Sequence, residues 1–163
     1  MRHALAALLL LLCLPLAACN AKASAGPTPV ERLRADAAAV AARPEAADPA
    51  IEVQHLLISF RGIPRGPAAT RTREEAEALA ADLYAEVQGG ADFAALQQEH
   101  SDDPGAGIYG MTQDPKVPAE WQRKGMVPAF GDVGWRLAVG EIGIAPYDPK
   151  TSPYGWHLIK RLK

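Results

Sequence analysis

Two histidines lie in the middle of apolar segments whose residues are typical of β-strands. His55 is part of IEVQHLLISF (residues 51–60), and His157 is part of YGWHLIKRL (residues 154–162). Because strand side chains alternate between two faces, each histidine shares its face with apolar neighbours. A single histidine in such a position is most often a core residue that bonds a backbone carbonyl. Two of them on paired strands would lie side by side, as a mutually satisfied pair.

Asp103 lies in the polar turn SDDP (residues 101–104), and an Asx residue before a proline is a common turn former. A metal site built from His55, Asp103 and His157 is the least favoured alternative. The histidines do not have a zinc-ligand spacing, and the glutamate of a zinc hydrolase is missing.

The elements that position these residues follow an N-terminal segment with the features of an export signal. Arg2 precedes an apolar run, residues 4–14, that is too short to span a bilayer as a mature helix. The sequence LAAC (residues 16–19) is similar to a bacterial lipobox. We therefore expect a lipoprotein signal peptide at 1–18 and an acyl chain on Cys19 that attaches the protein to a membrane. An ordinary secretory signal cut near the same place is the alternative.

This anchor would place the protein in the cell envelope, facing the periplasm. Asn20 follows the predicted lipidated residue, where an aspartate would favour the inner membrane. The sequence therefore favours the outer membrane of a Gram-negative cell.

The cysteines and the charge of the chain restrict the possible partners. If Cys13 is removed with the signal and Cys19 is acylated, the mature chain has neither a disulfide nor a free thiol. The full chain has a net charge of −2, and the loss of Arg2 leaves 16 basic against 19 acidic side chains. Nothing in this balance indicates nucleic-acid binding.

Residues 19–50 are rich in alanine and proline and are expected to form a tether. Within them, Thr28 as N-cap, Glu31 as its capping-box partner and Pro44 as a stop predict one short helix. The apolar stripe of this helix is thin, so we expect it to be weakly docked or solvated. The folded domain should comprise residues 51–163.

Local signals divide residues 51–163 into an α+β arrangement. Three helix starts are predicted from N-cap and first-turn residues, namely Thr72 with Glu75, Asp92, and Pro128. Apart from the two histidine segments, short strands are expected at residues 105–111 and 142–145. The order of these elements predicts a small antiparallel sheet of about four strands, covered by one layer of about four helices.

Four segments in order resemble the signature blocks of the parvulin-type peptidyl-prolyl cis/trans isomerases, or rotamases. They are VQHLLI, REEAEALAADLYAEVQGGADFAALQQEHSDD, MVPAFGDVGWRLAVGEI and YGWHLIKRL. The resemblance covers essentially residues 51–163 and implies the parvulin fold. It also implies a foldase that acts on proline-containing unfolded or exported polypeptides and needs no cofactor.

The resemblance implies roles for the residues at matching positions. The implied catalytic residues are His55, Asp103, His157 and Ser152, with Thr151 as the alternative to Ser152. The implied proline pocket contains Met126, Phe130 and Tyr109. Tyr109 departs from the family, because it stands where the pocket normally has a leucine.

An enzyme of this family rotates an X–Pro peptide bond. The barrier is about 20 kcal/mol because amide resonance is lost in the twisted state. No covalent bond is broken. The enzyme can lower the barrier by holding the ring in an apolar pocket and by bonding the twisted amide more strongly than the planar one.

Other departures from the family concern the surroundings of the implied site. Loops 111–125 and 145–153 are longer than usual and are expected to flank it. Gly131 and Gly134 interrupt the third predicted helix, at a cost of ~1 kcal/mol each relative to alanine. The same fold used as a non-catalytic clamp for unfolded chains therefore stays an alternative to catalysis.

Four arginines follow the first histidine segment, in a loop similar to the basic loop of the phosphate-selective parvulins. They are Arg61, Arg65, Arg71 and Arg73. Glycines and prolines separate them, so the favoured interpretation is a solvated loop that binds no anion.

Overall fold

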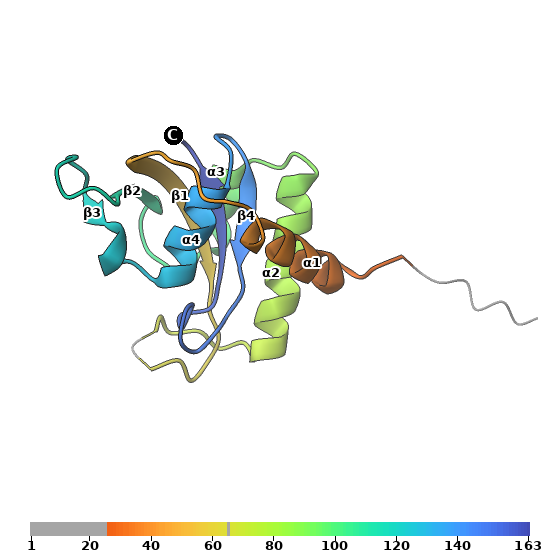
Figure 1. Cartoon of the computed structure of the whole chain (residues 1–163). Coiled ribbons are helices and arrows are strands. Elements are labelled where there is room, and N and C mark those ends of the chain that lie inside the picture. The colour runs from red at the N-terminus through yellow and green to blue at the C-terminus, as the bar shows by residue number, and fades with distance from the viewer. Residues whose placement is uncertain (1–25, 65) are drawn as a thin grey trace, which may run out of the picture.

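The computed structural model describes residues 26–64 and 66–163 (Figure 1). The predicted signal peptide, the lipidation site at Cys19 and Arg65 lie outside these residues. The helices are α1 (Pro29–Ala41), α2 (Arg73–Gln88), α3 (Phe93–His100), the 3-10 helix η1 (Arg123–Gly125) and α4 (Pro128–Arg136). The strands are β1 (Ala50–Ile58), β2 (Ile108–Thr112), β3 (Trp121–Gln122), β4 (Ile142–Ala145) and β5 (Trp156–Arg161). None of the helices in the described ranges has the length and apolarity needed to cross a bilayer.

The strands form one mixed sheet in the order β3-β2-β1-β5-β4. β1 lies at its centre and pairs antiparallel with β2 and β5, and β5 pairs antiparallel with β4. β3 has only two residues and runs parallel to β2. The predicted α+β fold class is confirmed. β3 is one strand more than the sequence indicated, because two residues carry no alternation that could be recognised.

Side-chain caps begin three of the helices where the sequence predicted them. Thr72 and Glu75 cap each other: the Thr72 hydroxyl accepts from the Glu75 N–H at 3.1 Å, and the Glu75 carboxylate accepts from the Thr72 N–H at 2.7 Å. Thr28 and Glu31 form the same reciprocal pair. Asp92 accepts a backbone N–H of the first turn of α3 at 2.9 Å. These bonds satisfy N–H groups that the helices leave free, so the starts of α1, α2 and α3 are set locally.

Helices cover both faces of the sheet, not the single face that the sequence indicated. α2 and α3 pack on the face that carries Leu56, Ile58 and Leu158, whereas α4 packs on the face of Val53 and Ile159 (Figure 1). α1 lies beside the edge strand β4 and contributes side chains to both cores. The central strands β1 and β5 bury nearly all of their residues on either side. Because both faces of this sheet are buried, each face needs its own layer of apolar side chains.

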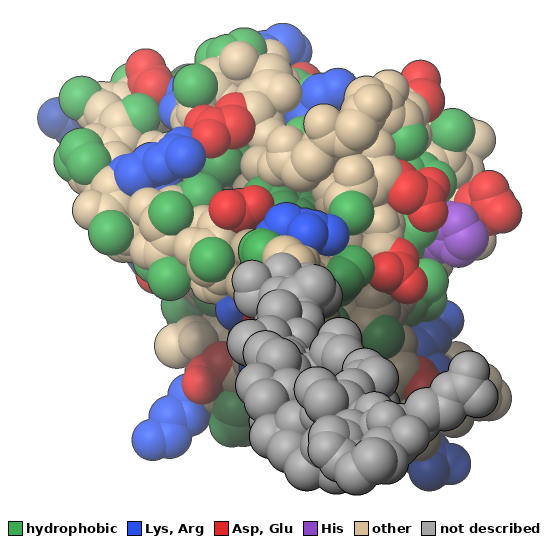
Figure 2. Space-filling model, turned by 90° about the vertical axis from the view of Figure 1, so that its right-hand side faces the viewer, with side chains coloured by type: hydrophobic (Ala, Val, Ile, Leu, Met, Phe, Trp, Pro, Cys, Tyr) green, Lys and Arg blue, Asp and Glu red, His purple; other side chains and the backbone are tan. Residues whose placement is uncertain are grey.

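α1 is firmly docked, which corrects the expectation of a weakly docked or solvated helix. Leu33 is fully buried in the core between α1, α2 and the sheet, and Val40 is buried in the core beneath α4. On α2, the side chains of Ala76 and Ala80 are fully buried. Because these side chains are small, the two helices can approach closely and even a thin apolar stripe is covered. Figure 2 shows this side of the molecule, where acidic and basic side chains are scattered among apolar ones.

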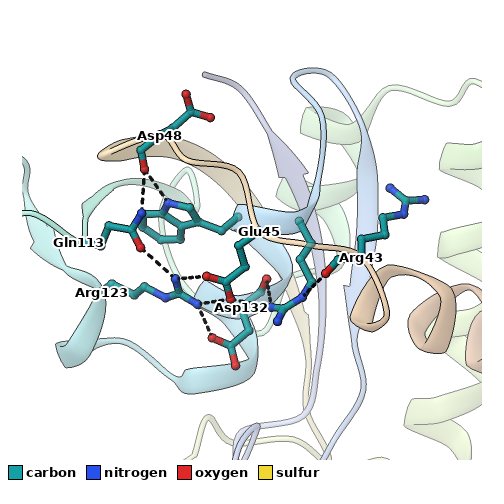
Figure 3. A network of polar contacts seen from close by, with 8 residues as sticks. Arg43, Glu45, Asp48, Gln113, Arg123 and Asp132 are labelled. Atoms are coloured by element: carbon teal, nitrogen blue, oxygen red, sulfur yellow. Dashed lines mark hydrogen bonds and ion pairs between the residues drawn. The ribbon is translucent and has the colours of Figure 1, made fainter.

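The segment between α1 and β1 is held against α4 and η1 by a polar network (Figure 3). Arg123 donates from both terminal nitrogens to the carboxylate of Glu45, each at 2.7 Å, and to Asp132 at 2.6 Å. Its guanidinium carbon also lies 4.7 Å from the ring centroid of Trp135. The Trp135 indole in turn donates to the carbonyl of Asp48 at 3.0 Å. The last residues of the predicted tether are therefore fixed to the folded unit.

The two glycines of α4 are points of close contact. A Cβ atom on Gly134 would lie 3.0 Å from Cδ1 of Ile51 and 3.3 Å from Cγ1 of Val53. A Cβ atom on Gly131 would lie 3.3 Å from Cγ of Arg123. These two glycines are weak helix formers, but because they lack a side chain, β1 and Arg123 can lie directly against α4.

Candidate active site

A cavity of about 460 Å³ opens on the α4 face of the sheet, between α4, the turn after α3 and the loop from β1 to α2. Six of the seven residues that the sequence implied for the site line it: His55, Asp103, Tyr109, Met126, Phe130 and His157. The other lining residues, which sequence reasoning missed, are Leu57, Gly66, Pro67, Asp102, Pro104, Val127 and Tyr154. The lining is mostly apolar, with a few convergent polar groups, as is usual for a ligand site.

His55 and His157 lie side by side on the floor of the cavity. In the antiparallel pairing of β1 with β5, Leu57 is opposite His157 and Ile159 is opposite His55, so the histidines are diagonal neighbours. Their Nδ1 atoms are 3.2 Å apart, and both side chains are buried. This is the arrangement that the strand alternation predicted.

Asp103 connects the histidine pair to Tyr109. Its Oδ2 lies 2.9 Å from Nε2 of His55 and accepts from the Tyr109 hydroxyl at 3.0 Å. Because an ionised carboxylate only accepts, His55 donates from Nε2, and in its neutral form its Nδ1 accepts from Nδ1–H of His157. Nε2 of His157, which has no partner among the described residues, then carries no proton. The hydrogen bonds therefore run in one direction: His157 donates to His55, and His55 donates to Asp103.

The surroundings shift the pKa values of three groups in this chain of contacts. The hydrogen bond from His55, followed by the one from Tyr109, lowers the pKa of Asp103. Burial, together with the neighbouring His55, lowers the pKa of His157 to about 3. Burial and then the Asp103 carboxylate raise the pKa of Tyr109 to about 12. At neutral pH the Asp103 carboxylate is therefore ionised, whereas the His157 imidazole and the Tyr109 phenol are neutral.

The turn that carries Asp103 is bonded to the end of β1. The Ser101 hydroxyl accepts from a backbone N–H of β1 at 3.1 Å and from the Asp103 N–H at 3.2 Å. Asp102 accepts from the Ser59 N–H at 2.7 Å and also pairs with Arg71. These four polar contacts fix the position of the turn and of the Asp103 carboxylate that faces the cavity.

Among the arginines after β1 that the structure describes, only Arg71 departs from the expectation of a solvated loop. Arg71 forms an ion pair with Asp102 in the wall of the cavity. Arg73 is exposed but stacks on Tyr147, with 5.0 Å from the guanidinium carbon to the ring centroid. Arg61 is exposed, as expected. The partner of Arg71 is 31 residues away in the sequence, so spacing could not reveal this pair.

Phe130 forms the apolar wall of the cavity. It is buried on α4, and its ring is T-shaped against His55 at 5.1 Å and against His157 at 5.7 Å between ring centroids. Tyr109 meets the same ring edge to face at 5.8 Å. Met126, from the turn between η1 and α4, is half-buried beside them. These aromatic edges hold one another in fixed orientations and leave an apolar space for a ring.

Ser152 is the implied site residue that the structure does not bring to the cavity. It is fully buried, and its hydroxyl donates to the carbonyl of Gly155 at 3.0 Å. The alternative, Thr151, donates from its hydroxyl to the carboxylate of Asp148 at 3.0 Å and is exposed. Both hydroxyls hold the loop before β5 in shape.

Within the described ranges, no three His, Cys, Asp or Glu side chains are arranged to hold a metal ion.

The chain is similar to a family model and to chaperones from other bacteria. The model of the family described as the PPIC-type PPIASE domain matches residues 39–163. The chain is 38% identical over 109 residues to "Chaperone SurA" of Chromohalobacter salexigens, which is 66% of this chain and 21% of the relative. It is 32% identical over 112 residues to "Chaperone SurA" of Pseudomonas fluorescens, which is 69% of this chain and 22% of the relative. The matches thus span about a fifth of the length of these chaperones.

A solved structure has the same fold. It is the peptidyl-prolyl isomerase ESS1 from Candida albicans, with a TM-score of 0.55 and 21% sequence identity. The similarity covers 81% of this chain and 73% of that one. At this level of identity the comparison supports the arrangement of helices and strands, and the chemistry must be argued from the side chains.

Proposed function

The chain belongs to the PPIC-type peptidyl-prolyl isomerase family, and from that premise we propose that its cavity binds a proline ring and catalyses rotation of the preceding peptide bond. The observation that carries the proposal is the juxtaposition of an apolar wall with one ionised carboxylate. Phe130 and Met126 supply the wall, and Asp103 supplies the carboxylate, in a cavity of about 460 Å³. Substrates are proline-containing segments of unfolded polypeptides.

The chemistry follows from the electronic structure of the amide. Resonance gives the C–N bond double-bond character by placing negative charge on the carbonyl oxygen, and rotation costs ~18–20 kcal/mol because this resonance is lost. A carboxylate close to that oxygen disfavours the charge-separated form. Asp103 therefore weakens the resonance of a bound X–Pro bond, while the apolar wall keeps the ring fixed and excludes water.

The buried histidines act through Asp103. His55 donates to its Oδ2, which keeps the carboxylate ionised and oriented toward the cavity. His157 holds the tautomer of His55 from the other side. We assign both histidines as positioning residues, because the contacts described here connect them to the proposed reacting group through Asp103.

The test is a protease-free assay of prolyl isomerisation on the wild type and two variants. Asp103→Ala should lower kcat/KM by about tenfold or more with little change in affinity for an unfolded client. Phe130→Ala should weaken both binding and turnover because it empties the proline pocket. Glu99→Ala, an exposed change on α3, is the control and should match the wild type. Full activity of Asp103→Ala would show that this carboxylate only forms the turn before Pro104.

A non-catalytic clamp is the second candidate function, and the relatives named as chaperones favour it. A clamp needs the apolar wall but not the carboxylate. It would bind an unfolded client with an affinity that Phe130→Ala reduces and Asp103→Ala leaves unchanged, while the wild type shows no isomerisation above background. The same set of variants therefore separates the two functions.

We also propose that the protein is exported and held at the cell envelope by lipid on Cys19, with the outer membrane favoured. This proposal rests on the similarity of LAAC to a lipobox and on Asn20. Mass spectrometry of the mature N-terminus tests it: a diacylated Cys19 is expected in the wild type, and Cys19→Ser should leave a chain without acyl groups. An unmodified N-terminus in the wild type would contradict the proposal.

A further inference from the structure

We propose that Trp121 extends the cavity as a second subsite, which binds an aromatic or large aliphatic side chain within about three residues of the substrate proline. This inference rests on the proposed function, because it takes the proline to lie between Phe130 and Asp103. It assigns the protein a substrate class, namely proline segments with a nearby bulky apolar residue.

Trp121 differs from the other tryptophans in its exposure. Its side chain is 43% exposed, whereas Trp135 and Trp156 are 0% and 2% exposed. A single exposed apolar residue is common on protein surfaces and needs no explanation. The position of this residue beside the cavity is what gives it significance.

Sheet pairing places Trp121 on the same face as the cavity. In the parallel pair of β2 with β3, Trp121 is in register with Met111, and Met111 shares its face of β2 with Tyr109. The rings of Tyr109 and Trp121 lie 6.3 Å apart between centroids, with an angle of 54°. Tyr109 lines the cavity on its other side, so the indole continues the wall of the proline pocket outward.

The spacing between the proline pocket and the Trp121 indole suits a side chain that lies close to the proline in the same substrate polypeptide. An extended chain advances ~3.3 Å per residue, so a side chain two or three positions from the proline reaches past Tyr109 to the indole. Stacking on an indole favours aromatic and large apolar side chains. Glu120 precedes Trp121, and Asp103 lies behind Tyr109. Acidic or phosphorylated residues are therefore disfavoured at this position.

The strip from Trp121 to Met126 is held in place before any substrate arrives. Arg123, in the middle of the strip, is fixed by its bonds to Glu45 and Asp132 (Figure 3). One end of the strip presents the exposed indole and the other end lines the proline pocket. A preformed pair of subsites loses less conformational entropy on binding than a mobile loop would.

The test uses the full-length chain and three peptides. The first contains a proline with phenylalanine two residues away, the second has serine in place of the phenylalanine, and the third keeps the phenylalanine but has alanine in place of the proline. Affinities are measured by calorimetry for the wild type, Trp121→Ala, Trp121→Phe and Ile108→Ala. Ile108 is the matched control, because it is similarly exposed but points to the opposite face of β2.

The wild type should bind the first peptide about tenfold more tightly than the second. Trp121→Ala should lose this difference and keep the affinity for the second peptide, whereas Trp121→Phe and Ile108→Ala should keep the difference. The tryptophan emission of the wild type should shift to the blue with the first peptide, and that of Trp121→Phe should not. Equal affinities of the wild type for the first two peptides, or an unchanged preference in Trp121→Ala, would overturn the inference.

The third peptide separates this inference from the proposed function. Weaker binding of the third peptide than of the first supports a proline pocket beside the indole. If the third peptide binds as tightly as the first, the apolar residue alone is recognised. The assignment of the subsite relative to a proline is then overturned. Isomerisation of the second peptide by the wild type tests the proposed function on its own.

Discussion

The Nδ1 atoms of His55 and His157 face each other at 3.2 Å, so one imidazole must donate to the other. Replacement of His55 by alanine leaves the Nδ1–H of His157 without an acceptor and removes a donor from Asp103. A buried polar group without a partner costs ~1–3 kcal/mol, so His55→Ala should lower the free energy of unfolding by about that amount. Urea denaturation measures it, and prolyl isomerisation should fall in parallel.

His100→Ala is the control for this prediction. His100 is half-exposed at the end of α3 and lies 3.7 Å from Glu99. Its removal should change stability by less than ~0.5 kcal/mol. An unchanged melting temperature of His55→Ala would mean that the pair is not mutually satisfied.

His157 should make the protein less stable as the pH falls below neutral. Burial lowers its pKa to about 3 in the folded protein, against 6.5 for an unperturbed histidine. Between these two values the unfolded chain binds a proton that the folded chain does not, so stability falls as pH falls. A difference of one bound proton changes the free energy of unfolding by at most ~1.4 kcal/mol per pH unit, which is about 2 kcal/mol between pH 6.5 and pH 5.

Urea denaturation of the wild type and of His157→Asn, at several pH values between 7 and 5, tests this dependence. The variant should be less stable at pH 7 but should lose less stability over this range. NMR of the imidazole nitrogens should show His157 neutral at pH 5. Protonation of His157 near pH 6 would refute the buried, neutral assignment.

Tyr109 should matter through its hydroxyl as well as its ring. The hydroxyl donates to Asp103 at 3.0 Å and is one cause of the lowered pKa of that carboxyl. Tyr109→Phe keeps the ring and removes this bond, so the pKa of Asp103 should rise. The acid limb of the pH profile of kcat/KM should therefore move to higher pH. Tyr154→Phe, which changes another tyrosine of the cavity, should leave the limb in place, and equal profiles for all three proteins would contradict the role of the hydroxyl.

Local signals were sufficient to predict the helix starts and the faces of the two histidine strands. The cap at Thr72 and Glu75 lies within one helical turn, and the alternation around His55 lies within one strand. Such features depend on neighbours in sequence. The family resemblance then identified six cavity residues, because its blocks also fix which strands and helices meet.

Features that depend on distant partners could not be predicted. The docking of α1 depends on the small side chains of α2 around Leu33, which lie more than 40 residues away in the sequence. The position of Ser152 depends on the direction of one hydroxyl in a loop, and no local pattern encodes it. The ion pair of Arg71 with Asp102 joins a loop to the turn beside Asp103, and composition alone marked that loop as solvated.

Leu33→Ala should show how strongly α1 contributes to the fold. The side chain is fully buried, and truncation of a buried leucine typically costs ~2–5 kcal/mol. Val30 lies on the same helix and is only partly buried, so Val30→Ala should cost clearly less. Urea denaturation of the two variants measures the difference. Equal and small losses would mean that α1 is the solvated helix that its sequence indicated.

The two glycines of α4 should respond in opposite directions to the same substitution. Alanine in a helix interior is favoured over glycine by ~1 kcal/mol. In Gly131→Ala the new Cβ meets side-chain atoms of Arg123, the nearest being Cγ at 3.3 Å. That side chain is long and can shift slightly, so this variant should be as stable as the wild type or more stable. In Gly134→Ala the Cβ meets Ile51 and Val53 within the core, the nearer at 3.0 Å, and overpacking of this kind costs ~1–3 kcal/mol. Gly134→Ala should therefore be the less stable of the two in thermal denaturation, and the reverse order would mean that β1 does not pack directly on α4.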